Sequence, residues 1–169
     1  YQMGHPGKKL LFMGQEFGQE KEWNEKQSLS WELLEDKKHL QLKNYMAALH
    51  AFYKANPALY QLDEKPEGFE WINADDCFRS IFSFVRHSAD GKNNLLFVIN
   101  FTPVARPDYR VGVPKRKQYK LILNSDDAQF GGSGKLQPEV YKAVKSECDG
   151  RPYSFAYDLP AYGVAVFKF

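Results

Sequence analysis

The residues with the clearest chemical potential lie in one polar stretch near the start of the 169-residue sequence. Glu16 follows a short apolar run, residues 10–13, which ends at Gly14. In barrels and open α/β folds, functional groups lie at the carboxyl ends of strands, so a carboxylate at this place can be functional. Glycoside chemistry uses two carboxylates that face one sugar bond. Glu16 is therefore a candidate site residue, and bracing of the loop is the alternative role.

The same stretch, residues 14–35, contains two of the three tryptophans, Trp23 and Trp31. Flat aromatic rings can stack on sugar rings, and long loops with large aromatics are often functional. The alternative is that these rings pack against a helix. The two interpretations weigh equally for Trp23, and packing is favoured for Trp31, which precedes Leu33 and Leu34. Three further acidic residues of the loop are expected to be solvated: Glu20, Glu22 and Glu25.

Other kinds of chemistry find little support in the sequence. The 23 basic and 21 acidic residues leave a net charge of +2, whereas a nucleic-acid protein usually has a strongly basic face. No apolar run approaches the roughly 18 residues of a membrane span. Cys77 and Cys148 form no metal or disulfide pattern, which suggests free thiols in a reducing compartment. The four histidines lack metal-ligand spacing: His5, His39, His50 and His87.

The elements that must position the polar stretch are a strand before it and a helix after it. Residues 8–13 predict a short parallel strand covered on both faces, because the apolar run is continuous and ends at glycine. Asp36 is a candidate N-cap of the helix, and Asn56-Pro57 predicts its end. The helix carries an apolar stripe that we expect to pack on a core: Leu42, Tyr45, Met46, Leu49, Phe52 and Tyr53.

From Gly68 onward the apolar residues alternate, which predicts strands. Seven strands are expected, over residues 69–73, 79–87, 94–101, 108–113, 118–124, 152–158 and 162–168. This number of short strands favours an antiparallel β-sandwich. A change of period and of charge places a boundary near residue 63, which gives two parts, residues 1–63 and 64–169. One strand and one helix cannot make a domain, so we expect the first part to be the last βα unit of a larger fold, cut from a longer chain.

A series of motifs runs along the whole sequence. Residues 7–19, GKKLLFMGQEFGQ, are followed by Glu22-Trp23-Asn24 and by Ser28-Leu29-Ser30-Trp31. Later motifs are NPAL at 56–59, GFEWI at 68–72, NFTPV at 100–104, YRVGVP at 109–114, LNSD at 123–126 and GGSG at 131–134. In type and order these motifs resemble the 1,4-alpha-glucan branching enzymes of glycogen synthesis. That family has Asn in place of Gln15 and Asp in place of Ser30, and both replacements are polar.

The resemblance implies the architecture of the alpha-amylase superfamily. Its members have an N-terminal β-sandwich, a central (β/α)8 barrel and a C-terminal β-sandwich. Residues 8–13 would be the eighth barrel strand, residues 14–35 the loop after it, and residues 36–54 the eighth helix. The fold class expected for the chain is therefore mainly β, a C-terminal antiparallel β-sandwich preceded by the last strand-loop-helix unit of a (β/α)8 barrel.

The resemblance also implies an activity for the parent enzyme. Such an enzyme cleaves α-1,4-glucan with retaining chemistry and transfers the segment to a 6-hydroxyl, which creates an α-1,6 branch. Its catalytic Asp, Glu and Asp come from barrel strands four, five and seven, so this chain would contain no catalytic residue and would be inactive alone. Gln15, Glu16, Phe17 and Trp23 would line the rim of the active site. No metal or organic cofactor is implied, and the location implied is the cytoplasm.

Two other roles stay open for the β-sandwich, glucan binding and purely structural support. Most aromatic residues fall inside predicted strands, which favours support; the exceptions and borderline cases are Tyr109, Tyr119, Phe130 and Tyr141. The expected partners are α-glucan and the missing N-terminal barrel, with no nucleic acid and no membrane. A lone parallel strand leaves its backbone unpaired. We therefore expect self-association of the chain or a displaced conformation of residues 1–20.

Overall fold

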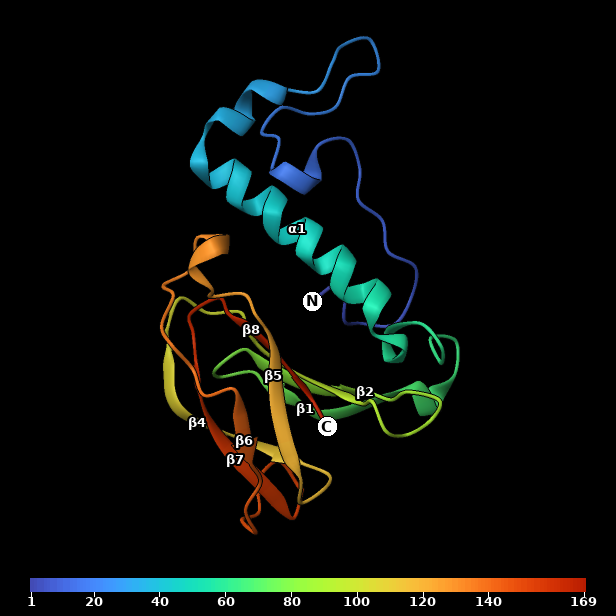
Figure 1. Ribbon diagram of the computed structural model, residues 1–169, viewed down its shortest axis with the longest axis vertical. Helices are drawn as coiled ribbons and strands as arrows, with labels where there is room; N and C mark the ends of the chain where they lie inside the picture. Colours follow the sequence, from blue (N-terminus) through green and yellow to red (C-terminus); the bar gives the residue numbers. More distant parts are fainter.

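Two antiparallel sheets, packed face to face, form the larger part of the structure, a computed structural model that describes residues 1–169 (Figure 1). The strands are β1 (Phe69–Asp76), β2 (Ile81–Arg86), β3 (Leu95–Asn100), β4 (Arg106–Val113), β5 (Gln118–Asn124), β6 (Val140–Lys142), β7 (Tyr153–Leu159) and β8 (Val164–Lys168). One sheet has the order β1-β2-β3-β8-β5-β6, and β4 pairs with β7 in the other. All pairings are antiparallel. The mainly β, antiparallel class is confirmed, and each of the seven predicted regions contains a strand.

The main hydrophobic core lies between the two sheets. It consists of 17 buried residues, contributed by strands of both sheets. On β7 the inward side chains Phe155, Tyr157 and Leu159 are buried, because alternate residues of a strand point to the same face. The rings of Tyr141 and Phe167 pack edge to face at 5.4 Å between centroids within this core. Aromatic packing of this kind accounts for the aromatic-rich composition of the β module.

A second hydrophobic cluster covers the outer face of the six-stranded sheet. Leu95, Phe97 and Ile99 of β3 belong to this cluster, while the intervening residues of β3 face the main core. Every residue of β3 is buried for this reason. The covering layer includes Ala58 and Leu59, which follow the helix, and the N-terminal segment. A two-sided environment explains why the sequence of β3 is continuously apolar rather than alternating.

A single α-helix, α1 (Lys37–Ala55), lies outside the sandwich (Figure 1). As predicted, the Asp36 carboxylate caps it by accepting a hydrogen bond of 2.7 Å from the backbone nitrogen of Lys38. The helix ends at Asn56, directly before Pro57, which is also as predicted. Five short 3-10 turns complete the fold: η1 (Gln15–Phe17), η2 (Trp31–Glu35), η3 (Pro57–Leu59), η4 (Pro66–Gly68) and η5 (Ala128–Phe130). None of the helices combines the length and apolar character that crossing a membrane requires.

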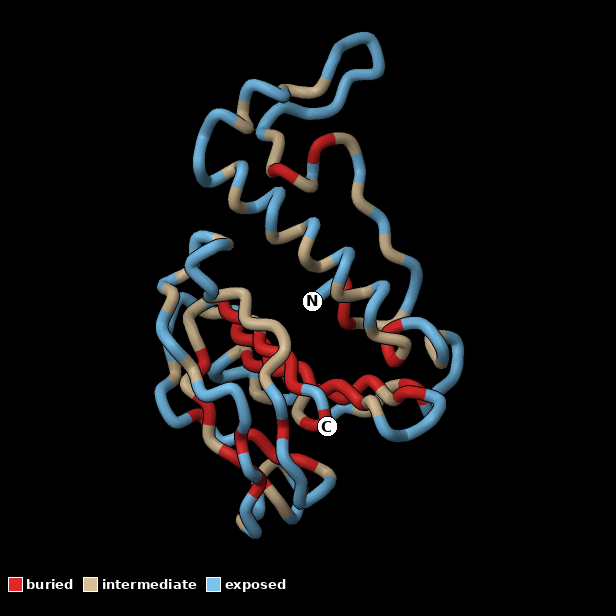
Figure 2. The backbone as a smooth tube through the Cα atoms, in the orientation of Figure 1, coloured by how far each residue is buried: buried red, intermediate tan, exposed pale blue.

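The apolar stripe of α1 is only half covered, which differs from the prediction of core packing. No residue of the helix is fully buried, and Figure 2 shows the helix in the colours of intermediate and exposed residues. At its C-terminal end Phe52 and Tyr53 pack against the second cluster, and near its middle Tyr45 contacts Phe130 of η5. The N-terminal half rests on η1 and η2 instead of on a sheet.

Two predicted features of the secondary structure are wrong. Residues 8–13 form no strand, and Leu10 is 71% exposed. A strand needs neighbours that accept and donate its backbone hydrogen bonds, and none of the eight strands pairs with this segment. The segment that was expected to be the last barrel strand therefore does not form a strand in this structure. The second difference is β6, which pairs with β5 and lies between the predicted strands 118–124 and 152–158, where no strand was expected.

Candidate functional site

The predicted site residues Gln15, Glu16 and Phe17 form the short turn η1. It lies between Gly14 and Gly18, whose φ angles of 91° and 71° suit glycine and let the chain reverse at both ends of the turn. The Gln15 side-chain oxygen accepts a hydrogen bond of 3.0 Å from the backbone nitrogen of Phe12. The turn is thereby tied to the end of the extended segment before it. Gln15 is exposed and Glu16 is half-buried, so both side chains reach solvent.

Phe17 is completely buried, which sets it apart from the other predicted rim residues. Its ring lies 5.1 Å from the ring of Trp31. The Phe17 carbonyl oxygen is 2.8 Å from Nδ1 of His39, which belongs to the first turn of α1. Phe17 therefore fixes the loop on the helix and cannot touch a ligand in this conformation. Trp31 thus packs on Phe17, the role that the sequence favoured for it, although 49% of the residue is exposed.

Trp23 lies at the far end of the same loop and is 47% exposed. Its ring packs edge to face on Phe12, with 5.3 Å between centroids. Because Gln15 hydrogen-bonds to the backbone of Phe12, the structure connects Gln15 and Trp23 through that one residue. The ring of Trp23 is thus held by its contact with Phe12, while part of it remains accessible to solvent. The ring of Phe17 packs on Trp31 and that of Trp23 on Phe12, so the two rings belong to different contacts of the loop.

The loop also contains a polar groove of about 290 Å³ that the sequence reasoning did not identify. Gln19 holds its two walls together: the side-chain oxygen accepts from the backbone nitrogen of Ser30 at 2.9 Å, and the side-chain nitrogen donates to the carbonyl of Lys21 at 3.1 Å. The lining residues are mostly amides, hydroxyls and carboxylates: Gln19, Lys21, Glu22, Asn24, Gln27, Ser28, Leu29, Ser30 and Glu32. Such a lining suits a ligand rich in hydroxyl groups. The high density of polar residues between Trp23 and Trp31 is the sequence feature that could have indicated this groove.

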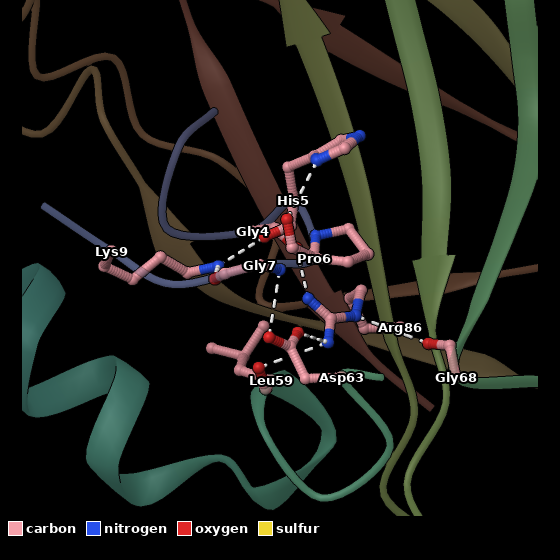
Figure 3. Close-up of polar contacts among 9 residues, drawn as sticks. All are labelled: Gly4, His5, Pro6, Gly7, Lys9, Leu59, Asp63, Gly68 and Arg86. Carbon is pink, nitrogen blue, oxygen red and sulfur yellow. Dashed lines mark hydrogen bonds and ion pairs between the residues drawn. The ribbon is translucent and has the colours of Figure 1, made fainter. Parts of the chain in front are cut away.

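A second polar cluster joins the start of the chain to the sandwich, and Arg86 of β2 is its centre (Figure 3). Arg86 is fully buried, which for an arginine requires partners for its charge. Its guanidinium donates to the Asp63 carboxylate at 2.7 Å, and to three backbone carbonyl oxygens. These carbonyls belong to Gly4 at 2.7 Å, Leu59 at 3.2 Å and Gly68 at 3.3 Å.

The same cluster also fixes the segment around Gly7. The backbone nitrogen of Gly7 donates to the second oxygen of Asp63 at 2.9 Å. Lys9 donates to the carbonyl of Gly7 at 2.6 Å and to the carbonyl of His5. Burial lowers the pKa of Lys9, and the nearby Asp63 carboxylate opposes that shift. Because the buried guanidinium of Arg86 already donates to four acceptors of the fold, we interpret the cluster as an anchor.

The anchor is supported by a close approach at Gly4. A side chain at this position would begin 2.5 Å from the ring of Phe97, so only glycine fits there. No local pattern in the sequence pointed to Arg86, whose partners are up to 82 residues away. The structure has no group of three or more His, Cys, Asp and Glu residues that could hold a metal ion.

The aromatic residues that could have given the sandwich a sugar-binding surface are mostly inside it. Tyr109, Tyr119 and Tyr141 are buried in the main core, and Phe130 packs against Tyr45 of α1. Burial raises the pKa of Tyr119 to about 12, and its hydroxyl donates a hydrogen bond of 2.9 Å to the carbonyl of Lys115. These rings therefore support the fold and offer no platform at the surface.

The sequence matches the pattern of a known family and of longer proteins. Residues 71–169 match the family described as "Alpha amylase, C-terminal all-beta domain". The 1,4-alpha-glucan branching enzyme GlgB of Butyrivibrio fibrisolvens is 52% identical over 169 residues, which is 100% of this chain and 26% of that enzyme. The GlgB of Halothermothrix orenii is 45% identical over 99% of this chain and 27% of that enzyme. The chain thus spans about a quarter of the length of these curated relatives.

Solved structures with a similar fold are much more distant in sequence. The trehalulose synthase MutB mutant A258V, in complex with Tris, superposes with a TM-score of 0.52 at 13% identity. The match covers 84% of this chain and 21% of that chain. At this level of identity the likeness concerns the fold alone.

Proposed function

The chain belongs to the family of the alpha-amylase C-terminal all-beta domain, and from this premise we propose that it is the C-terminal part of a 1,4-alpha-glucan branching enzyme. The observation that carries the proposal is the extent of the likeness to GlgB. It covers the whole chain, including residues 1–70, which precede the part matched by the family pattern. An all-β domain on its own would leave the activity open, whereas the additional helix and polar loop connect the chain to branching enzymes.

The proposed reaction is the cleavage of an α-1,4-glucan and the transfer of the released segment to a 6-hydroxyl, which forms an α-1,6 branch. The catalytic carboxylates would come from the part of the enzyme that precedes this chain. No residue here is assigned a catalytic role, and the chain alone is expected to be inactive. The reaction needs no cofactor, and the proposed location is the cytoplasm, where glycogen synthesis would take place.

The polar loop is the part of this chain that we assign to the substrate. Trp23 would offer its exposed face to a sugar ring, and the half-exposed carboxylate of Glu16 would accept hydrogen bonds from sugar hydroxyls. The side-chain oxygen of Gln15 accepts a hydrogen bond from the backbone nitrogen of Phe12, so its amide nitrogen would donate to the glucan. Phe17 would act indirectly, by holding the loop on α1. The groove between Gln19 and Glu32 extends this polar surface.

We also propose that residues 1–63 complete a barrel and that residues 64–169 are a separate sandwich domain. Residues 8–13 would become the eighth strand when neighbouring barrel strands are present to pair with them. The exposure of Leu10, at 71%, and of Phe12, at 45%, supports this, since such side chains are normally covered in a parallel strand. Without the barrel, the same side chains would favour self-association of the chain.

The test compares two proteins, the product of the complete coding sequence and the 169-residue chain. Each is incubated with amylose, and the α-1,6 linkages formed are counted by NMR of the anomeric protons. We expect new branches with the longer protein and none with the chain alone. Hydrolysis without transfer by the longer protein would reject the branching function. Branching by the chain alone would reject the assignment of the catalytic groups to the preceding part.

A glucan-binding role for the sandwich is the alternative. The burial of Tyr109, Tyr119 and Tyr141 speaks against it and favours a structural role. Affinity electrophoresis in gels containing amylopectin separates the two roles. Retardation of the 169-residue chain that persists after Trp23→Ala would support a binding site on the sandwich, whereas retardation lost in W23A would assign binding to the loop.

A further inference from the structure

A single hydrogen bond joins the polar loop, residues 14–35, to helix α1. Nδ1 of His39 lies 2.8 Å from the carbonyl oxygen of Phe17. A carbonyl oxygen can only accept, so Nδ1 carries a proton and donates it, whether the imidazole ring is neutral or charged. No other hydrogen bond connects this loop to the helix. His39 is therefore the polar tie between the turn η1 and α1.

The backbone of the loop also comes close to the face of α1 on which His39 lies. His39 and Leu42 are one helical turn apart and share that face. A β-carbon at Gly18 would lie 3.0 Å from Cδ2 of Leu42 and 3.7 Å from Nδ1 of His39, so η1 rests directly on the beginning of the helix (Figure 1). Apolar contacts of this kind have no preferred direction. The hydrogen bond from His39, in contrast, fixes the orientation of the peptide group that accepts it.

The peptide group that His39 holds has a hydrogen bond at both of its polar ends. Its oxygen, on Phe17, accepts from His39, and its nitrogen, on Gly18, donates to the carbonyl of Gln15 at 3.2 Å. The hold of the helix is thus passed on to the backbone of Gln15. Glu16 lies between Gln15 and Phe17, so the position of its backbone is set from both sides.

A second pair of contacts extends this series to the far end of the loop. The side-chain oxygen of Gln15 accepts from the backbone nitrogen of Phe12 at 3.0 Å, and the ring of Phe12 packs on that of Trp23 at 5.3 Å between centroids. Gln15 and Trp23, both assigned to the substrate above, are therefore connected to α1 by a continuous series of contacts that begins at His39.

We infer that His39 is a positioning residue for the glucan, because it holds η1 in the place from which Gln15, Glu16 and Trp23 reach the substrate. This inference rests on the proposed function and deepens it by naming the residue that keeps the substrate surface in place. His39 acts through Phe17 and needs no contact with the glucan. A turn that is in place for only part of the time binds with an affinity reduced by that fraction. Loss of the hydrogen bond should therefore appear in the KM for glucan.

The test uses two matched substitutions in the protein made from the complete coding sequence. His39→Asn places an amide nitrogen where Nδ1 lies in histidine and can still donate to Phe17, whereas His39→Gln places it where Nε2 lies and cannot. In H39Q the KM for amylose should rise about fivefold with kcat unchanged, the factor that one ordinary hydrogen bond supplies. H39N should keep a KM close to that of the wild type. Equal KM values for H39N and H39Q would overturn the inference.

The split between KM and kcat separates positioning from general support of the fold. A substitution that only unfolds part of the enzyme lowers the concentration of active protein, so the apparent kcat falls while KM stays the same. That result for H39Q would assign His39 to stability and would overturn the positioning role.

Hydrogen exchange followed by mass spectrometry gives a second readout that does not depend on activity. The backbone nitrogens of Phe17, Gly18 and Gln19 donate within the turn, so their exchange requires the turn to open. Peptides that cover residues 12–20 should exchange faster in H39Q than in the wild type, and H39N should exchange like the wild type. Peptides from β2 and β3 should be the same in all three proteins. Unchanged exchange of residues 12–20 in H39Q, or faster exchange in β2 and β3 as well, would overturn the inference.

The proposed function and the role of His39 can fail independently. The branch count on amylose reports the function, and the comparison of H39N with H39Q reports the positioning. A wild type that forms branches, with equal KM values for the two variants, rejects the positioning role alone. A wild type that forms no branches rejects the proposed function, while faster exchange in H39Q but not in H39N would still support the hold of His39 on the turn.

Discussion

The guanidinium of Arg86 lies 2.7 Å from the carboxylate of Asp63, and this ion pair joins the second strand of the sandwich to the segment after the helix. The Arg86 side chain is fully buried, and 18% of the Asp63 side chain is exposed. Removing one partner of a buried pair leaves the other charge without compensation. The pair therefore helps to hold the segment after the helix on the sandwich.

Replacing Arg86 by methionine should lower the free energy of unfolding by about 3–5 kcal/mol, because the Asp63 carboxylate and three carbonyl groups lose their donor. Urea unfolding followed by circular dichroism measures the change. The exposed pair of Lys120 and Glu139, at 3.3 Å, provides the control, and Lys120→Met should change stability by less than about 0.5 kcal/mol. A similar small effect for R86M would contradict the anchor role.

Phe17→Ala should reduce stability by about 3–5 kcal/mol, because it removes a fully buried ring and leaves a cavity between the loop and α1. Trp23→Ala in the same loop should cost less than about 1 kcal/mol, since half of that ring is already in water. Chemical unfolding of both variants under one condition gives the comparison. Equal losses would mean that Trp23 is a packing residue and would weaken its assignment to the substrate.

Asp36→Ala should lower stability by about 1 kcal/mol, because the backbone nitrogen of Lys38 loses its acceptor at the start of α1. Asp36→Ser restores an acceptor and should recover most of the loss. The measurement is the thermal unfolding midpoint of the three proteins. If D36A and D36S unfolded at the same temperature, the side-chain cap would not be the stabilising feature.

Asp90 should titrate at an unusually low pH. Its carboxylate accepts hydrogen bonds from Ser88, Lys92 and Asn93, and these lower its pKa to about 2. The folded state therefore holds the proton less tightly than the unfolded state. Its contribution to stability is present above the ordinary pKa of 3.8 and is lost as the pH falls from there through about 2. NMR titration of the Asp90 carboxyl carbon tests the value, and a midpoint near 3.8 would contradict it.

The sequence predicted the parts of the fold that depend on local pattern. Short apolar runs, alternating in some strands and continuous in β3, located seven of the eight strands, and Asp36 and Pro57 gave the ends of the helix. β6 was missed because three residues, Val140–Lys142, are too few to show alternation. Residues 8–13 were predicted to be a strand because the apolar run is continuous and ends at Gly14. Whether an apolar run becomes a strand depends on neighbours that supply hydrogen bonds, and a run of residues carries no information about them.

The sequence selected the polar loop as the candidate site but did not predict the contacts within it. Loop position and residue type singled out Glu16 and Trp23, and the family resemblance added Gln15; the structure leaves all three accessible. The burial of Phe17 depends on Trp31 and His39, which approach it only through the fold. The Arg86 anchor collects its partners from the N-terminal segment and from residues 59–68, so no single stretch of the sequence could reveal it.

The position of β8 within the six-stranded sheet has a consequence for how the molecule is made. β8 comes after all other strands in the sequence but lies between β3 and β5, with antiparallel pairing on both sides. On the ribosome, β1 to β3 emerge first and expose an unpaired edge until residues 164–168 have been synthesised. A messenger RNA truncated shortly before these codons would yield a protein that lacks β8, a central strand of the sheet and not an edge strand. We therefore expect such shortened products to be bound by chaperones or degraded by proteases.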